Sequence, residues 1–332
     1  MKTRRLGSTG PEVSAIALGC MGMSGAYGPS QREESIATIG AALDAGVTLL
    51  DTGDFYGMGH NELLIAEAVA ARPRDDYLLS VKFGGLRGPE GRLLGVDTRP
   101  AAVKTALAYS LTRLGTDHVD VYRPARLDPS VPIEETVGAI SELVQAGYVR
   151  YIGLSEVGAG TLRRAAAIHD ICDLQIEYSL ASRGIEDEIL EACRESGVAV
   201  TAYGVLSRGL ISGHFDAGRE LHPMDFRAHA PRFADGNRER NLALVDALRG
   251  IAGDAGATVA QVAIAWVLSR GEDIVPVIGA RRRDQLDESL GALELSLSED
   301  VLAALEHALP SASVAGERYP EHGMATLDSE PG

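Results

Sequence analysis

Three polar side chains follow two apolar runs near the N-terminus, at points where strands would end. Asp51 ends the run 48–50, Tyr56 follows it in a glycine-bounded loop, and Lys82 lies at the end of a second run, 77–83. If these runs are neighbouring parallel strands, the three side chains meet at one edge of the sheet. An ammonium beside a phenol lowers the phenol pKa, and a carboxylate keeps the ammonium charged and oriented. The pattern predicts that Tyr56 gives or takes a proton near neutral pH. The alternative is a structural Asp–Lys pair beneath an incidental tyrosine.

Composition and charge argue against several classes of protein. The chain has 332 residues, 45% of them hydrophobic, which suffices for one large domain or two ordinary ones. A net charge of −16 disfavours binding to nucleic acid. No apolar run is long enough to cross a bilayer and no signal peptide is evident, so we expect no membrane association and a cytoplasmic location. Three scattered cysteines suit neither a disulfide framework nor a zinc site, and we expect no metal.

Eight apolar runs of strand length alternate with amphipathic stretches of helix length. The runs cover 15–19, 47–50, 77–83, 119–122, 149–155, 174–178, 199–203 and 274–279. The helical stretches cover 31–45, 61–71, 98–115, 133–146, 159–169, 185–195, 240–254, 258–270 and 283–292. Strands that are apolar throughout suit a parallel sheet buried on both faces, and eight strand–helix units predict an α/β fold with a single (β/α)8 TIM barrel.

Other segments lie outside these repeated units. An N-terminal β-hairpin is predicted over 5–14, and a long loop, 204–238, follows the seventh strand. An extra helix, 297–308, and a tail, 310–332, end the chain. We expect one domain over 1–332, in which the long loop and the tail shape the pocket.

The sequence also indicates how a nucleotide would be held. A doubly wound dinucleotide fold carries G-x-G-x-x-G after its first strand, and the run 19–23 does not fit that pattern. At the end of the eighth strand, residues 279–283 (Gly-Ala-Arg-Arg-Arg) open a helix. Free backbone N–H groups and guanidiniums there make a phosphate site. In so acidic a chain this cluster favours an anionic cofactor, although a solvated basic helix start is the alternative.

With these residues in view, the sequence resembles the aldo-keto reductase superfamily nearly from end to end. The resemblance is carried by residues 6–10, 50–57, the strand of Lys82, 153–156, 175–180, 207–213 and 279–289. It implies an NADPH-dependent carbonyl reductase that acts on a small-molecule aldehyde or ketone. Hydride would pass from the nicotinamide to the carbonyl carbon, and Tyr56 would protonate the oxygen, with Lys82 and Asp51 setting its pKa.

The resemblance also implies roles for individual residues. Tyr203 would stack on the nicotinamide, whose carboxamide would bond Ser155, Gln175 and Glu156. Leu206 and Arg208 would lie along the pyrophosphate, Arg281 and Arg282 would meet the 2′-phosphate, and Gln285 and Ser289 would face the adenine. Further cofactor contacts fall on Gly22, Met23, Asp51 and Gly279, and substrate contacts on Phe55, Arg123 and Arg126. Ser289 stands where the family usually has Asn.

One departure from the family pattern concerns the substrate side. Ala125 stands where a histidine that donates to the substrate oxygen is expected, and losing such a donor costs about 3 kcal/mol of transition-state stabilisation. Arg126, Arg123 or a water are the candidate substitutes. A branch resembling pyridoxal reductases carries Ala-Arg here, which makes an aromatic aldehyde such as pyridoxal a candidate substrate.

Two other functions stay open at the level of sequence. One is a non-catalytic NADPH-binding regulatory subunit, which the missing histidine favours and the intact Asp51, Tyr56 and Lys82 disfavour. The other is a Schiff-base aldolase with Lys82 as nucleophile. Asp51 beside Lys82 is expected to raise the lysine pKa, which would be wrong for an amine nucleophile. The oligomeric state is left open.

Overall fold

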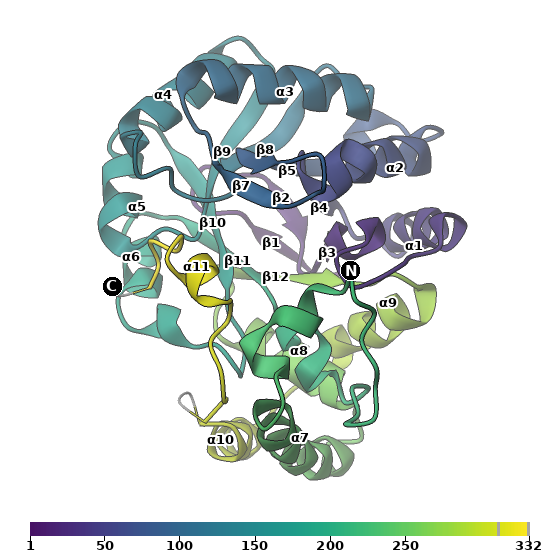
Figure 1. Cartoon of the computed structure of the whole chain (residues 1–332). Helices are drawn as coiled ribbons and strands as arrows, with labels where there is room; N and C mark the ends of the chain where they lie inside the picture. Colours follow the sequence, from purple (N-terminus) through teal and green to yellow (C-terminus); the bar gives the residue numbers. More distant parts are fainter. Residues whose placement is uncertain (311–312, 331–332) are drawn as a thin grey trace.

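All eight predicted strands form one closed barrel in the computed structural model, which describes residues 1–310 and 313–330 (Figure 1). The barrel strands are β3 (Ala17–Gly19), β4 (Leu49–Gly53), β5 (Leu78–Phe83), β8 (Val119–Pro124), β9 (Val149–Ser155), β10 (Ile171–Glu177), β11 (Ala199–Tyr203) and β12 (Ile274–Gly279). Neighbouring strands are parallel, and β12 pairs with β3 to close the sheet. The predicted (β/α)8 barrel is confirmed.

Most of the helices surround the barrel and bury the outer face of the sheet, whereas α11 lies over one end of it (Figure 1). They are α1 (Arg32–Asp44), α2 (His60–Val69), α3 (Pro100–Leu114), α4 (Ile133–Gln145), α5 (Ala159–Ala166), α6 (Ile189–Glu195), α7 (Asn237–Asp254), α8 (Val259–Ser269), α9 (Arg283–Leu290), α10 (Glu299–Ala308) and α11 (Glu321–Met324). Local sequence sets their ends. Pro100 begins α3, and Gly115, at φ +66°, ends it.

The predicted N-terminal hairpin closes one end of the barrel. Strands β1 (Thr3–Arg5) and β2 (Glu12–Ser14) pair antiparallel, and Leu6 and Val13 join the apolar cluster inside the barrel. Gly7 between them has φ +67°, and a Cβ there would lie 2.4 Å from the carbonyl oxygen of Cys172. The turn therefore requires glycine, both for its conformation and for the close approach.

The structure adds elements that the sequence patterns did not predict. A second hairpin, β6 (Gly85–Arg87) and β7 (Leu93–Val96), follows β5. The 204–238 loop folds around 3₁₀ turns, η5 (Ser207–Ser212), η6 (Phe226–His229) and η7 (Pro231–Phe233), over a small apolar core of its own. The stretch predicted as helix 185–195 divides into η4 (Gly184–Glu186) and α6. These pieces are shorter than the windows in which periodicity can be read.

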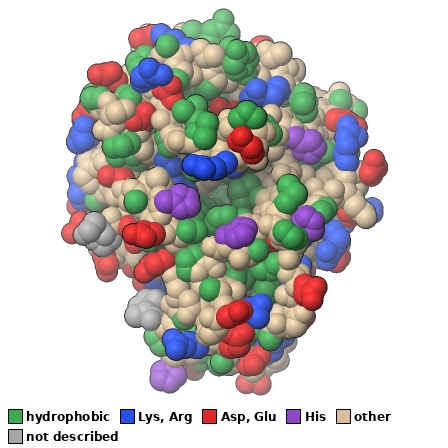
Figure 2. All heavy atoms as spheres, in the orientation of Figure 1, with side chains coloured by type: hydrophobic (Ala, Val, Ile, Leu, Met, Phe, Trp, Pro, Cys, Tyr) green, Lys and Arg blue, Asp and Glu red, His purple; other side chains and the backbone are tan. Residues whose placement is uncertain are grey.

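The C-terminal segment, which we define as residues 313–330, returns from α10 toward the mouth of the barrel. It passes over the ends of β10 and β11 (yellow in Figure 1). Residues 311, 312, 331 and 332 of the predicted tail lie outside the described residues. The face in view is hollowed near its centre, with hydrophobic side chains inside the hollow and basic side chains on its rim (Figure 2).

Candidate active site

The ion pair between Asp51 and Lys82 lies at the carboxyl ends of adjacent strands. Strand β4 pairs with β5 so that Gly53 lies opposite Lys82, which brings the Lys82 Nζ to 2.5 Å from the Asp51 Oδ2. The other carboxylate oxygen accepts hydrogen bonds from Ser80 Oγ at 2.9 Å and from Gln175 Nε2 at 2.8 Å. Both charged side chains are almost fully buried. The pair is thus held rigidly from β4, β5 and β10.

Tyr56 lies directly beside this pair. Its ring centroid is 5.2 Å from the Lys82 Nζ, and Phe55 packs edge-on against the ring at 4.9 Å. A Cβ at Gly53 would lie 3.3 Å from both aromatic rings, so glycine there permits the close approach. The structure therefore brings Asp51, Tyr56 and Lys82 together at one strand end.

The pKa shifts at this cluster are opposite to those expected from sequence. Burial raises the pKa of Tyr56 well above its ordinary value, and the Asp51 carboxylate raises it further. Burial also lowers the pKa of Lys82, and this effect exceeds the opposing effect of Asp51. Both predictions were wrong because burial dominates: at Lys82 it outweighs the charge of Asp51, and at Tyr56 the charge of Asp51 acts in the same direction as burial. Tyr56 consequently holds its proton at neutral pH, which is the form a general acid needs.

The two arginines after β8 occupy different places. Arg123 has no exposed surface, and its guanidinium donates to Thr201 and Ser80 and pairs with Asp173 at 2.9 Å. It belongs to the barrel interior, so the expectation that it contacts substrate is corrected. Arg126 instead lies at the mouth, where its Nη2 donates to the Tyr319 hydroxyl at 3.3 Å.

The carboxyl end of β12 carries the expected basic cluster. Gly279 ends the strand, and Arg281 to Arg283 lead into α9. Arg282 pairs with Asp284 at 2.9 Å and Arg283 with Glu34 at 3.0 Å. On α9 itself the Gln285 Oε1 accepts from the Arg281 N–H at 3.0 Å, and the Ser289 Oγ donates to the Gln285 carbonyl at 2.8 Å.

Arg281 is the member of this cluster best suited to a phosphate. Within the part of the chain that the structure describes, its Nη1 donates only to backbone carbonyls, those of Tyr27 and Pro29, at 3.0 and 3.4 Å. Burial lowers its pKa, and the neighbouring guanidinium of Arg227 lowers it further. A half-buried cation among other cations gains from a dianion. The residues present therefore fit a cofactor that carries a phosphate here.

Other predicted cofactor residues line the route from this cluster to the barrel mouth. Gly22 and Met23 lie in η1 (Met21–Ser24), Ser155 ends β9 beside Gln175 of β10, Tyr203 ends β11, and Leu206 precedes η5, which contains Arg208. A Cβ at Gly22 would lie 3.2 Å from Arg281 Cγ. The Gly22 backbone in the loop after β3 thus lies close to the Arg281 side chain of the basic cluster.

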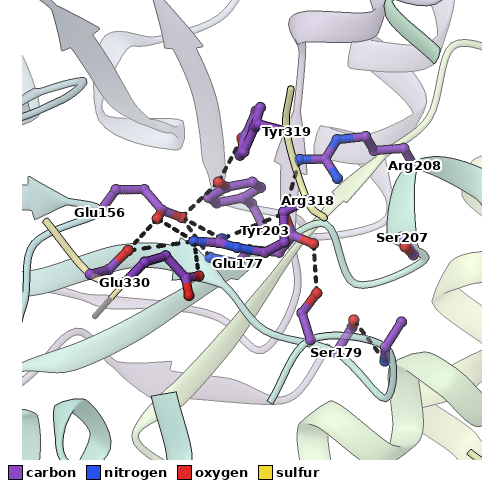
Figure 3. A network of polar contacts seen from close by, with 12 residues as sticks. Glu156, Glu177, Ser179, Tyr203, Ser207, Arg208, Arg318, Tyr319 and Glu330 are labelled. Carbon is purple, nitrogen blue, oxygen red and sulfur yellow. Dashed lines mark hydrogen bonds and ion pairs between the residues drawn. The ribbon is translucent and has the colours of Figure 1, made fainter. Parts of the chain in front are cut away.

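A buried ion network covers part of this route (Figure 3). Arg318 of the C-terminal segment pairs with Glu156 at 2.9 Å, with Glu330 at 2.7 Å and with Glu177 at 3.6 Å. Arg208 pairs with Glu177 at 2.9 Å, and its guanidinium lies 4.6 Å from the Tyr319 ring centroid. Arg208 thus has carboxylate and aromatic partners in this structure.

Glu156 serves as the anchor of the network. It is fully buried at φ +53°, a conformation that is strained for a residue with a side chain. Burial alone raises the pKa of its carboxyl, but the Arg318 guanidinium lowers it, to about 2. Its oxygens accept from Tyr203, Ser329 and Arg318. The expected bond from Glu156 to a carboxamide is replaced by these contacts to the C-terminal segment.

Reasoning from sequence named the tail around 314–320 as shaping the pocket and placed Glu177 at a strand end, but it gave Arg318, Tyr319 and Glu177 no individual roles. Arg318 and Glu156 are separated by 162 positions in the chain. The signal available was compositional, since Gly316 to Pro320 combine two charges and a tyrosine in a tail without helical period.

Two further findings concern metal ligands and membrane spans. No group of three or more His, Cys, Asp or Glu side chains among the described residues is arranged to hold a metal ion. Of the helices described, none by itself has the length and apolar character to cross a membrane; only α7 and α8 together, bent by 84°, pass that test.

Comparison with known proteins places the chain in a family. Residues 15–310 match the profile of the Aldo/keto reductase family, and the chain belongs to that family. It is 42% identical to "Probable aldo-keto reductase 1" of Glycine max over 95% of this chain and 91% of that protein. It is 38% identical to "Aldo-keto reductase yakc [NADP(+)]" of Schizosaccharomyces pombe, over 96% and 94% respectively.

A solved structure agrees with this assignment. The glycerol dehydrogenase AKR11B4 from Gluconobacter oxydans superposes with a TM-score of 0.84 at 28% identity, over 92% of this chain and 94% of that one. The protein is therefore an oxidoreductase that acts on carbonyl groups with a nicotinamide cofactor.

Proposed function

We propose that this protein uses NADPH to reduce an aldehyde or ketone to the alcohol, with Tyr56 as the proton donor. The observation that carries the proposal is the buried Asp51–Lys82 pair beside Tyr56 at the carboxyl ends of β4 and β5. In barrels of this type the carboxyl ends of the strands are where reactions occur.

The protein side of the reaction follows from this geometry. NADPH, when bound, supplies the hydride that the carbonyl carbon takes. Tyr56, protonated at neutral pH because of its raised pKa, gives the proton to the carbonyl oxygen. Lys82 lies against the Tyr56 ring and is held in place by Asp51. The positive charge of Lys82 stabilises the Tyr56 phenolate until solvent returns the proton.

Two surfaces support NADPH as the cofactor. Tyr203 offers an aromatic surface at the end of β11, Gln175 lies on the adjacent strand β10, and Ser155 lies opposite Gln175 on β9, a set of groups that suits a nicotinamide ring and its carboxamide. Arg281, with only carbonyl partners, suits the 2′-phosphate that distinguishes NADPH from NADH. Arg282 adds a second guanidinium beside it, and the yeast relative named above carries NADP(+) in its name.

The chemistry of the mouth favours an aromatic aldehyde, with pyridoxal as the candidate. Phe55 packs on Tyr56, and the Tyr319 ring lies 5.5 Å from the Arg126 guanidinium. Flat aromatic rings and one cation suit a planar ring that carries polar groups. The Ala125–Arg126 pair that marks the pyridoxal reductase-like branch supports the same choice.

The test follows NADPH oxidation with a panel of aldehydes that includes pyridoxal. We expect wild-type turnover and loss of turnover in Tyr56→Phe, with NADPH affinity retained because the hydroxyl alone is removed. Tyr109→Phe, at an exposed tyrosine on α3, is the matched control and should behave as wild type. NADPH binding without oxidation by any aldehyde would reject the proposal.

A further inference from the structure

One phenol links the proposed substrate side of the mouth to the proposed cofactor side. The Tyr319 hydroxyl lies 3.3 Å from Arg126 Nη2 and 2.8 Å from the Tyr203 hydroxyl. Arg126 follows β8, Tyr203 ends β11, and Tyr319 comes from the C-terminal segment. The three groups meet only because that segment folds over the mouth. Figure 3 shows the Tyr319 hydroxyl against that of Tyr203.

Counting protons fixes the direction of these hydrogen bonds. The Tyr203 hydroxyl has a single proton and donates it to Glu156 Oε1 at 2.7 Å. Tyr319 must then donate to the Tyr203 oxygen, and its own oxygen accepts from Arg126, since a guanidinium only donates. The chain runs in one direction, from Arg126 to the Glu156 carboxylate, and each member orients the next.

The far end of this chain is firmly anchored. Glu156 also accepts from both guanidinium nitrogens of Arg318, at 3.1 and 2.9 Å. Arg318 adjoins Tyr319 in sequence and is only 7% exposed. The position of the Tyr319 hydroxyl is therefore set by a buried ion pair one residue away.

Among residues 1–310 and 313–330, no carboxylate forms an ion pair with the Arg126 guanidinium. Its Nη1 donates to the Ala125 carbonyl at 2.7 Å and its Nη2 to Tyr319. The Glu156 carboxylate, at the far end of the hydrogen-bond chain, already accepts hydrogen bonds from Arg318, Ser329 and Tyr203. Strand β8, which Arg126 follows, pairs directly with β5, which carries Lys82. The Arg126 charge also acts on Tyr56, whose pKa it lowers against the larger effect of burial, so the guanidinium lies close enough to the proton donor to favour an oxygen that gains negative charge.

We propose that Tyr319 is a positioning residue for the reduction: it holds the Arg126 guanidinium toward the carbonyl oxygen, where Ala125 offers only a methyl group. This inference rests on the proposed function. Arg126 is the group that touches substrate, and Tyr319 acts through it. A carbonyl substrate would place its oxygen between Tyr56 and Arg126, so two donors would stabilise the negative charge that develops on that oxygen.

The experiment is a double-mutant cycle in the full-length chain, with Tyr319→Phe, Arg126→Met and their combination. Loss of one donor to the developing oxyanion is expected to lower kcat about 100-fold in Arg126→Met. Tyr319→Phe should lower kcat about tenfold, with KM nearly unchanged, because a misplaced donor keeps part of its effect. In the Arg126→Met background, Tyr319→Phe should cost nothing further, since the group it positions is gone.

Four further measurements separate positioning from simple structure. Tyr148→Phe, at an exposed tyrosine, is the matched control and should leave kcat unchanged. NADPH affinity, read by quenching of protein fluorescence, and the thermal midpoint should stay at wild-type values in Tyr319→Phe. Arg126→Lys should retain part of the kcat that Arg126→Met loses.

The outcomes distinguish this inference from the proposed function. With wild-type turnover intact, three results would each overturn the role of Tyr319. They are independent, multiplicative losses in the cycle, an unchanged kcat in either single variant, and a loss confined to NADPH affinity or folding. Absence of turnover in the wild type with NADPH bound would instead reject the proposed function itself.

Discussion

Replacing Arg318 by methionine should destabilise the protein far more than replacing an exposed arginine. Arg318 is 7% exposed and supplies two of the hydrogen bonds that Glu156 accepts. In Arg318→Met the carboxylate would keep its bonds from Tyr203, Ser329 and the Glu177 N–H but lose its cation. Breaking a buried pair in this way costs about 3–5 kcal/mol, and the remaining bonds favour the lower end, about 3 kcal/mol.

The assay is equilibrium unfolding in denaturant, with Arg163→Met as the control. Arg163 pairs with Glu195 at 2.8 Å, but both side chains are about half exposed, so solvent screening leaves this pair a small contribution to the free energy of unfolding. Limited proteolysis should cut Arg318→Met first within 313–330, since that segment loses its anchor.

A second variant tests the cause of the loss. Adding Glu156→Gln to Arg318→Met removes the unpaired buried charge and should restore part of the stability. Equal denaturation midpoints for Arg318→Met and Arg163→Met would contradict this cost of an unpaired buried carboxylate. A further loss of stability when Glu156→Gln is added to Arg318→Met would contradict it as well.

Three further predictions concern pH, cofactor choice and the lysine. Burial, and then the charge of Glu62, raises the pKa of Asp54 from 3.8 to about 7, so the folded protein loses stability as pH rises through that range. Asp54→Asn should therefore have a higher thermal midpoint than wild type above about pH 7 and lose that advantage in acid. In binding titrations, Arg281→Met should weaken NADPH affinity about tenfold or more and NADH affinity little. Arg283→Met, at an arginine paired with Glu34, should change neither affinity. Borohydride with a carbonyl substrate should leave Lys82 unmodified by mass spectrometry, because its amine is held by Asp51; a lysine adduct would support the aldolase chemistry instead.

The fold was predictable because its signals are local and repeated. Eight apolar runs separated by amphipathic stretches specify a parallel sheet covered by helices, and the barrel follows from their number. The β6–β7 hairpin was missed because its strands are three and four residues long, with Leu86, Leu93 and Leu94 partly exposed, and so show no alternation. The single domain over 1–332 and the cytoplasmic location stay predictions.

At the site, sequence predicted which groups meet better than it predicted their protonation. Asp51 and Lys82 lie at strand ends whose pairing follows from chain order, so their contact could be foreseen. The pKa directions of Tyr56 and Lys82 could not, because they depend on how completely the folded chain excludes water. The Arg318–Glu156 pair depends on the path of an aperiodic tail, which no local pattern specifies.

Isotope transfer in a single turnover follows the hydride and the role of Tyr56 in one experiment. NADPH carrying deuterium at the transferable position of its nicotinamide is mixed with excess protein and one aldehyde, and the alcohol is analysed by mass spectrometry. The account predicts a single deuterium on the former carbonyl carbon with wild-type protein and no alcohol with Tyr56→Phe. Alcohol without deuterium, or undiminished alcohol formation by Tyr56→Phe, would contradict it.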